Sequence, residues 1–144
     1  MNPIPAIANF MTPLPFSLES TQTLNAAHEL MRARKVRHLP IIDGGALVGL
    51  LSLNDLHLIE TLKDVDPAEV EIADAMTHAP FAVAFTAPID DVADEMAQRR
   101  ISSAVVMNGL LVVGIFSAVD ALAALAAVVR EQSLRGMLAV LLPE

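Results

Sequence analysis

The sequence predicts an α/β (α+β) fold made of two copies of one β-α-β-β-α unit. Of the 144 residues, 54% are hydrophobic, which is ample material for a core and excludes a disordered chain. Shifting the sequence by 65 positions aligns residues 7–56 with residues 72–121 without a gap, and 14 of these 50 positions are identical. Within each copy, short β-branched stretches alternate with segments whose apolar residues recur at helical spacing.

Each copy begins with a short extended stretch, 16–18 in the first and 81–83 in the second, and a helix follows. Thr21 and Thr86 are candidate N-caps of these helices, and Pro88 favours the first turn of the second one. Apolar residues then recur with the helical period and predict a buried stripe on each helix. They are Leu24, Ala27, Leu30 and Met31 in the first copy and Ile89, Val92 and Met96 in the second.

A β-hairpin and a second helix complete each copy. Ser52 and Ser117 open the second helices, and Asp55 and Asp120 lie in their first turns. The hairpin turns contain glycines and an Asp or Asn, which tolerate positive φ. The predicted strands are 36–42 and 47–51 around Asp43-Gly44-Gly45, and 101–107 and 110–116 around Asn108-Gly109.

The repeats divide the chain into a first copy at 1–62 and a second at 72–130. Residues 63–71 form an acidic linker, which is either a docking or cation site or a solvated connection that ends in a short helix. Residues 131–144 form an apolar tail beyond the repeat. Because soluble monomers rarely expose such a patch, the tail either folds back or lies at a subunit interface, and we favour the interface. A peripheral membrane anchor is the lesser alternative, because the polar face lacks basic residues.

Composition excludes several classes of function. The chain has 9 Lys and Arg against 17 Asp and Glu, a net charge of −8, which disfavours binding to nucleic acids or anionic membranes. It contains no cysteine, so disulfides and thiolate chemistry are excluded, and a cytoplasmic location is expected. The amino terminus lacks the features of a signal peptide. The apolar run 104–129 contains a turn dipeptide, β-branched residues and Asp120, so we expect no membrane span.

Two sets of short motifs resemble the CBS domain. The first copy contains Met11-Thr12-x-x-Pro15 and the run His38-Leu39-Pro40-Ile41-Ile42-Asp43-Gly44, followed by Gly49-Leu50-Leu51-Ser52-Leu53-Asn54-Asp55. The second copy contains Met76-Thr77-x-x-Pro80 and Gly114-Ile115-Phe116-Ser117-Ala118-Val119-Asp120. Two such domains in tandem are similar to a CBS domain pair, or Bateman module. The resemblance covers roughly 5–130, so we expect a stand-alone pair without an attached catalytic or transport domain.

The resemblance implies a regulatory module whose two repeats pack through their sheets about a pseudo-twofold axis. In such modules, clefts between the repeats bind AMP, ADP, ATP, S-adenosylmethionine or related ligands, and two modules pair as a homodimer. The resemblance also implies that ligand binding alters contacts with a regulated enzyme or transporter. The module itself is expected to require no cofactor. The alternative is a ligand-free module for interaction or oligomerisation.

The resemblance also indicates the ligand-binding residues. Asp55 and Asp120 match the carboxylate that accepts hydrogen bonds from ribose hydroxyls, and Ser52 and Ser117 match the hydroxyl three residues earlier. The same Ser-x-x-Asp pattern also caps an ordinary helix, and the two roles are compatible.

Basic residues occur near one candidate site only. Arg37 and His38 match positions that direct basic groups toward phosphates, or else Arg37 is a solvent-facing cation. The second copy has Ser102-Ser103 there, so we expect unequal clefts and favour the one near His38.

No other cluster indicates metal binding or catalysis. His28, His57 and His78 are scattered, without i, i+4 pairing and without cysteine, so no metal site is expected. No Walker loop, Gly-x-Gly-x-x-Gly or Gly-x-Ser-x-Gly motif is present, and no nucleophile has a base beside it in the pattern. We therefore expect a protein that is not an enzyme.

Overall fold

The computed structural model describes residues 3–14 and 16–141. Pro15 of the first motif, the first two residues of the predicted first copy and the last three of the predicted tail lie outside these residues. The first copy contains η1 (Ile7–Asn9), β1 (Thr12–Pro13), α1 (Leu24–Arg34), β2 (His38–Asp43), β3 (Ala46–Ser52) and α2 (Leu53–Glu60). The second contains η2 (Ile72–Asp74), β4 (Thr77–His78), β5 (Ala82–Ala84), α3 (Ile89–Arg99), β6 (Ser103–Asn108), β7 (Leu111–Ser117) and α4 (Ala118–Leu141).

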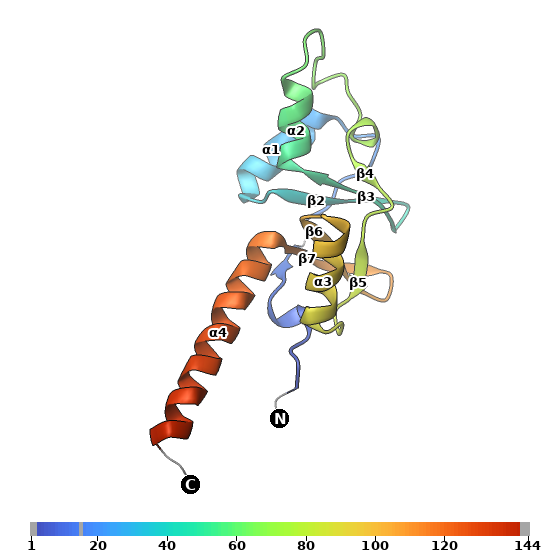
Figure 1. The fold of residues 1–144 in the computed structure, drawn as a ribbon. Coiled ribbons are helices and arrows are strands. Elements are labelled where there is room, and N and C mark those ends of the chain that lie inside the picture. The colour runs from blue at the N-terminus through green and yellow to red at the C-terminus, as the bar shows by residue number, and fades with distance from the viewer. Residues whose placement is uncertain (1–2, 15, 142–144) are drawn as a thin grey trace.

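The mixed α+β fold is confirmed, with both predicted hairpins in place (Figure 1). β2 pairs with β3 and β6 with β7, antiparallel in both cases. Gly44, Gly45 and Gly109 in the turns have φ values of 56°, 81° and 62°, as such turns require. β5 runs parallel to β6, whereas the corresponding stretch of the first copy forms only a bridge between Leu18 and Ile41.

The two copies exchange their leading strands. The sheets have the orders β2-β3-β4 and β1-β7-β6-β5, so β1 of the first copy extends the second sheet and β4 of the second copy extends the first. Thr12 pairs with Ile115 in one sheet, and Thr77 pairs with Leu50 in the other. Each sheet is therefore completed by a segment from the opposite repeat.

Two equivalent glycines permit this exchange. A Cβ atom on Gly114 would lie 2.7 Å from the carbonyl oxygen of Thr12 and 2.8 Å from the sulfur of Met11. A Cβ atom on Gly49 would lie 2.3 Å from the sulfur of Met76. Glycine stands at both positions because the exchanged segment, a methionine followed by the paired strand, lies too close to the hairpin for any side chain there.

The helices begin two residues later than Thr21 and Thr86 predict. The N-cap of α1 is Thr23, whose side chain accepts a hydrogen bond from the Ala26 amide. The N-cap of α3 is Pro88, which provides no side-chain cap. The predictions of caps at Thr21 and Thr86 are therefore wrong.

The backbone ahead of each helix explains this delay. Ile72 donates to the Gln22 carbonyl, and Leu24 donates to the Val70 carbonyl. In the second copy, the Ile7 amide donates to the Ala87 carbonyl in the same way. These bonds hold the chain extended through the predicted cap positions, so the helices begin only after them.

Three groups of buried apolar residues form the core. One lies within the first repeat, around Leu24, Leu39 and Leu51, and one lies within the second, around Val92, Val106 and Phe116. The third joins the two sheets and consists of Leu14, Leu50, Val105 and Ile115. Leu50 and Ile115 are equivalent positions of the two copies. The repeats thus pack through their sheets about a pseudo-twofold axis.

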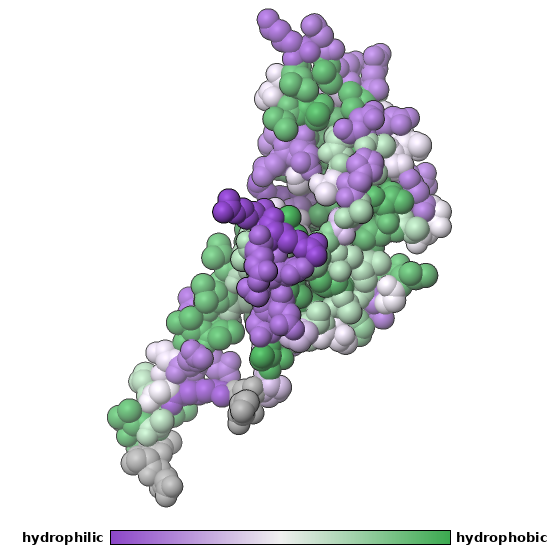
Figure 2. Space-filling view, turned by 45° about the vertical axis from the view of Figure 1, so that its right-hand side comes forward, coloured by the Kyte–Doolittle hydropathy of each residue, from purple (hydrophilic) through white to green (hydrophobic). Residues whose placement is uncertain are grey.

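Helix α4 continues through the predicted tail without a break. It spans 24 residues and projects from the body of the molecule (Figure 1). Residues 129–141 are all exposed. Figure 2 shows hydrophobic residues on both halves of this helix, with hydrophilic residues between them. No helix among the described residues is long and apolar enough to cross a membrane.

Candidate functional site

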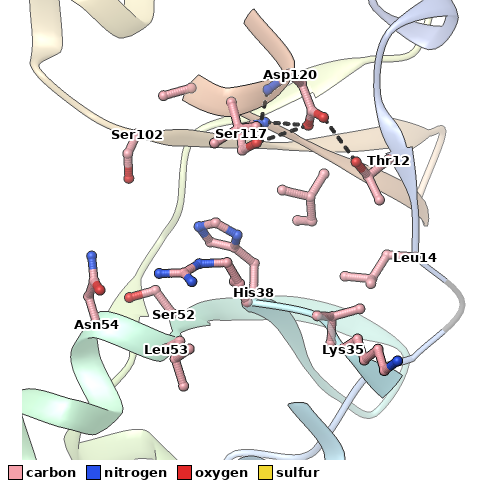
Figure 3. Close-up of a pocket in the computed structure, with 15 residues that line it drawn as sticks. Thr12, Leu14, Lys35, His38, Ser52, Leu53, Asn54, Ser102, Ser117 and Asp120 are labelled. Atoms are coloured by element: carbon pink, nitrogen blue, oxygen red, sulfur yellow. Dashed lines mark hydrogen bonds between the residues drawn. The ribbon is translucent and has the colours of Figure 1, made fainter. Parts of the chain in front are cut away.

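A cleft of about 390 Å³ lies between the two repeats (Figure 3). This volume is within the range of about 300–1,000 Å³ that is usual for small-molecule sites. Five of the six residues predicted to bind a ligand line the cleft: Arg37, His38, Ser52, Ser117 and Asp120. The remaining predicted residue, Asp55, is not part of its lining.

Asp120 connects the start of α4 to the exchanged strand β1. Its Oδ2 atom accepts hydrogen bonds from the Ser117 amide at 2.8 Å and from the Ser117 hydroxyl at 3.0 Å. Its Oδ1 atom accepts a hydrogen bond from the Thr12 hydroxyl at 3.0 Å. Figure 3 shows the Asp120 and Thr12 side chains facing each other at the edge of the cleft. One oxygen therefore caps the helix while the other meets a hydroxyl group from outside it.

Asp55 has a different environment. It forms a capping box with Ser52, in which the Ser52 amide donates to Oδ2 at 3.0 Å and the Asp55 amide donates to the Ser52 hydroxyl at 3.1 Å. The structure gives its carboxylate no hydrogen bond from the exchanged strand, and Thr77, the counterpart of Thr12, does not line the cleft. The two halves of the site are thus unequal in geometry.

His38 lies in the cleft, and its pKa is affected by both Asp120 and Asp55. It begins β2, opposite Ser52 in the register with β3, and its ring projects toward Ser117 and Asp120 (Figure 3). Burial lowers the pKa of His38 below its ordinary value, and the charge of Arg37 lowers it further. The carboxylates of Asp120 and Asp55 raise this pKa, but their effects are smaller. At neutral pH, His38 therefore presents an uncharged imidazole to the cleft.

Two exposed cations line the cleft, as His38 does. Lys35 ends α1 in the left-handed conformation, with φ of 55°, and Arg37 follows two residues later. Leu14, Val36 and Ile115 supply the apolar wall of the cleft. The site thus combines cations, a carboxylate and an apolar surface, which together suit a ligand with a flat ring, hydroxyl groups and a negative charge.

The two phenylalanines of the opening stretches lie elsewhere. The Arg34 guanidinium lies 4.8 Å from the centre of the Phe16 ring, and Arg99 lies 4.7 Å from the Phe81 ring. Neither phenylalanine lines the cleft, and both pack against the buried cores. These two equivalent pairs serve packing within each repeat.

Sequence reasoning missed several residues of the cleft. Thr12, Leu14, Lys35 and Asn54 were not singled out as contacts, although Thr12 belongs to a motif that occurs in both copies. That repetition was the available signal for Thr12. Thr12 lies opposite Asp120 because β1 pairs with β7 of the other repeat. The repeat in the sequence does not reveal which copy a strand pairs with.

Comparison with known families identifies both repeats. The family model described as the CBS domain matches residues 7–58 and again residues 71–127. No curated protein shows significant sequence similarity to the chain.

Solved structures share this fold. Each of the three described here aligns with this chain over nearly the whole of its own length. A protein assigned to acetoin utilization (AcuB) from Vibrio cholerae is 27% identical, with a TM-score of 0.74, over 90% of this chain and 96% of that one. The CBS domain pair of protein MJ0100, in complex with 5′-methylthioadenosine and S-adenosyl-L-methionine, is 24% identical with a TM-score of 0.77, over 87% and 98%. CBSX2 in complex with AMP is 23% identical with a TM-score of 0.70, over 85% and 97%.

Proposed function

The chain belongs to the CBS domain family, and on this premise we propose that it is a regulatory module that binds an adenosine-containing ligand between its repeats. The main support for this proposal is that the Asp120 carboxylate faces the Thr12 hydroxyl at the edge of the cleft. The Oδ1 atom there can accept hydrogen bonds from the ribose hydroxyls, with Thr12 turning to the ligand. The complexes of MJ0100 and CBSX2 with adenosine-containing ligands support this ligand class.

The rest of the cleft supports an orientation of the ligand in which the ribose lies at Asp120. The adenine ring would lie on the apolar wall formed by Leu14, Val36 and Ile115. Phosphates, or the charged end of another adenosine derivative, would lie toward His38 and Arg37. A phosphate group beside His38 would raise its pKa and favour its protonation.

We assign the signal to a change in the angle between the repeats. The ligand would contact Thr12 and Asp120, which come from different repeats: Thr12 lies on β1, which pairs with β7, and Asp120 lies in the first turn of α4. Binding can shift the arrangement only if the ligand has different affinities for two arrangements. A partner enzyme or transporter in the cytoplasm would respond to that shift.

A second role is favoured by the exposed side of α4. Leu122, Leu125 and Val129 lie on one exposed stripe of this helix, and beyond the repeat Leu134 and Leu138 are also exposed, on another face of the same helix. We propose that α4 pairs with the same helix of a second copy, because the two halves of such a homodimer would cover each other's leucines. This role is compatible with ligand binding and would remain if no ligand bound.

Thermal unfolding in the presence of ligands tests the proposal. The panel contains AMP, ADP, ATP, S-adenosylmethionine, NAD and cyclic dinucleotides, each with and without magnesium. A ligand at about 100 times its Kd stabilises a protein by roughly 2.7 kcal/mol, which raises the Tm by several degrees.

Two further comparisons make the result specific. The 2′-deoxy form of the best nucleotide should give a smaller shift, because it lacks one hydroxyl for Asp120. GMP controls for a general effect of nucleotide charge. If no panel member shifts the Tm at millimolar concentration, the ligand-binding role is wrong and the interaction module remains.

A further inference from the structure

Three potential metal ligands meet on the outer side of the first repeat. The Nδ1 atom of His28, on α1, lies 2.7 Å from the Oε1 atom of Glu60, on α2. The rings of His28 and His57 have centres 6.2 Å apart and meet edge to face at 71°. One ligand atom from each of the three residues lies within 4.8 Å of the other two. None of the three lines the cleft between the repeats.

The packing of α1 against α2 produces this cluster. Ala27 and Leu56 are fully buried in the same core group, and each directly precedes one of the histidines. Glu60 follows His57 by three positions, so the two side chains share one face of α2. The sequence spacing could not reveal the site, because its third ligand comes from a different helix.

The chemistry of the three groups is that of a transition-metal site. Imidazole nitrogens and a carboxylate oxygen are common ligands of Zn²⁺, at about 2.0–2.2 Å, and three protein ligands leave a fourth position for water. All three side chains are partly accessible, with 26% of the His28 side chain and 28% of the Glu60 side chain exposed. They can therefore close the remaining separation by rotating, without moving a helix.

We propose that His28, His57 and Glu60 form a binding site for a divalent transition metal such as Zn²⁺. The metal would replace the proton between His28 and Glu60 and would tie α1 to α2. It would thereby stabilise the first repeat, independently of any ligand in the cleft.

The second repeat shows that the fold itself does not require these polar residues. At an offset of 65, the equivalents of His28, His57 and Glu60 are Ala93, Leu122 and Leu125. Leu122 and Leu125 are exposed on α4, and the second repeat packs its own core without any polar cluster there. The cluster is thus a feature of the first repeat alone.

One neighbouring cation competes with the metal. The Nη2 atom of Arg32 lies 3.5 Å from the Nε2 atom of His28. When Nδ1 binds a metal, Nε2 carries the proton and can no longer accept from Arg32. Because Arg32 is exposed, it can turn into solvent, and Arg32→Ala should strengthen metal binding by removing a nearby positive charge.

Calorimetric titration of the full-length, EDTA-treated protein with ZnCl₂ tests the site. We expect one Zn²⁺ per chain, a rise in Tm with Zn²⁺, and binding at least tenfold weaker in His57→Ala. Substitution with Co²⁺ should give a visible absorption band that His57→Ala removes. His57 is exposed, so this variant should fold, and circular dichroism verifies that it does. If it does not, His57→Gln and Glu60→Gln serve instead.

His78→Ala is the matched control. His78 is also an exposed histidine, but its ring nitrogen lies 3.0 Å from the Ala73 carbonyl oxygen and it is not part of the cluster. It should leave Zn²⁺ binding unchanged. The proposal is overturned if the wild type binds no Zn²⁺, if His57→Ala weakens binding less than tenfold, or if His78→Ala weakens it equally.

Discussion

At the scale of single residues, the proposed site depends on Asp120, whose two carboxylate oxygens have different hydrogen-bond partners. Oδ2 caps α4 through Ser117, and Oδ1 meets the Thr12 hydroxyl from the opposite repeat. The capping and ligand roles anticipated for Ser-x-x-Asp therefore do not compete in the second repeat. In the first repeat, Asp55 closes a capping box with Ser52 and does not line the cleft.

His38 leads to a prediction about how the stability of the protein depends on pH. Burial and Arg37 hold the pKa of His38 below its ordinary value, so the unfolded chain binds a proton there more readily than the folded chain. As the pH falls below about 6.5, the unfolded state takes up this proton first, and the free energy of unfolding decreases.

The measurement is urea unfolding of the wild type and of His38→Gln between pH 7.5 and pH 5. The wild type should lose more stability over this interval than the variant does. Parallel pH profiles for the two proteins would show that His38 titrates in the folded chain as it does in the unfolded one.

At the scale of elements, the exchange of leading segments sets both the helix starts and the sheet edges. Residues ahead of α1 pair with residues 70–72, and residues ahead of α3 pair with residues 5–7. The β1 and β4 strands then pair with the edges of the two hairpins, at Gly114 and Gly49. The two repeats are therefore joined by backbone hydrogen bonds as well as by apolar packing.

The corrected helix cap is directly testable. Thr23→Ala should destabilise the protein by about 1 kcal/mol, because it removes the side-chain bond to the Ala26 amide. Thr21→Ala is the matched control and should have little effect. Chemical unfolding of the two variants checks this, and a larger loss in Thr21→Ala would restore the original cap assignment.

The equivalent glycines provide a second pair of variants. Gly114→Ala and Gly49→Ala should each cost about 1–3 kcal/mol of stability, because the new methyl group clashes with the exchanged segment. Only Gly114→Ala displaces Thr12, so it alone should also weaken binding of AMP.

Unfolding curves of both variants measure the loss of stability, and AMP titrations measure the change in AMP binding. Equal loss of AMP binding in the two variants would contradict the assignment of the site to the Asp120 half of the cleft.

At the scale of the whole molecule, α4 is the element that extends beyond the two packed repeats (Figure 1). Its last part contributes no buried residue, and its apolar side chains remain in contact with solvent in the single chain. Such a surface is stable in water when a second copy covers it.

Truncation after Arg130 tests this pairing. We expect the full chain to sediment as a dimer and the truncated chain as a monomer with an intact fold, since the removed residues that the structure describes are all exposed. The double variant Leu134→Lys with Leu138→Lys should have the same effect in a full-length chain. Identical sedimentation of all three proteins would contradict pairing through α4.

The repeat made much of this architecture predictable from sequence. It located both hairpins, their glycine turns and the helices opened by Ser52 and Ser117, because local turn and capping chemistry sets these features. The resemblance to the CBS domain, rather than the repeat alone, indicated five of the residues that line the cleft.

Long-range pairing was not predictable in the same way. A 65-residue period is equally consistent with a strand that pairs within its own copy or with the other copy, so neither the Thr12–Asp120 contact nor the delayed helix starts could be read from it. The cluster of His28, His57 and Glu60 depends on how α1 packs on α2, which local spacing does not encode.

Calorimetric titration of AMP and of S-adenosylmethionine into the wild type, Asp120→Asn and Asp55→Asn tests the central claim most directly. The substitutions keep the shape of the side chain and remove its charge. Loss of a charge-assisted hydrogen bond costs about 1.5–3 kcal/mol, so binding should weaken at least tenfold in Asp120→Asn and less than threefold in Asp55→Asn. Unchanged affinity in Asp120→Asn, or no binding of either ligand to the wild type, would contradict an adenosine site at the Asp120 edge of the cleft.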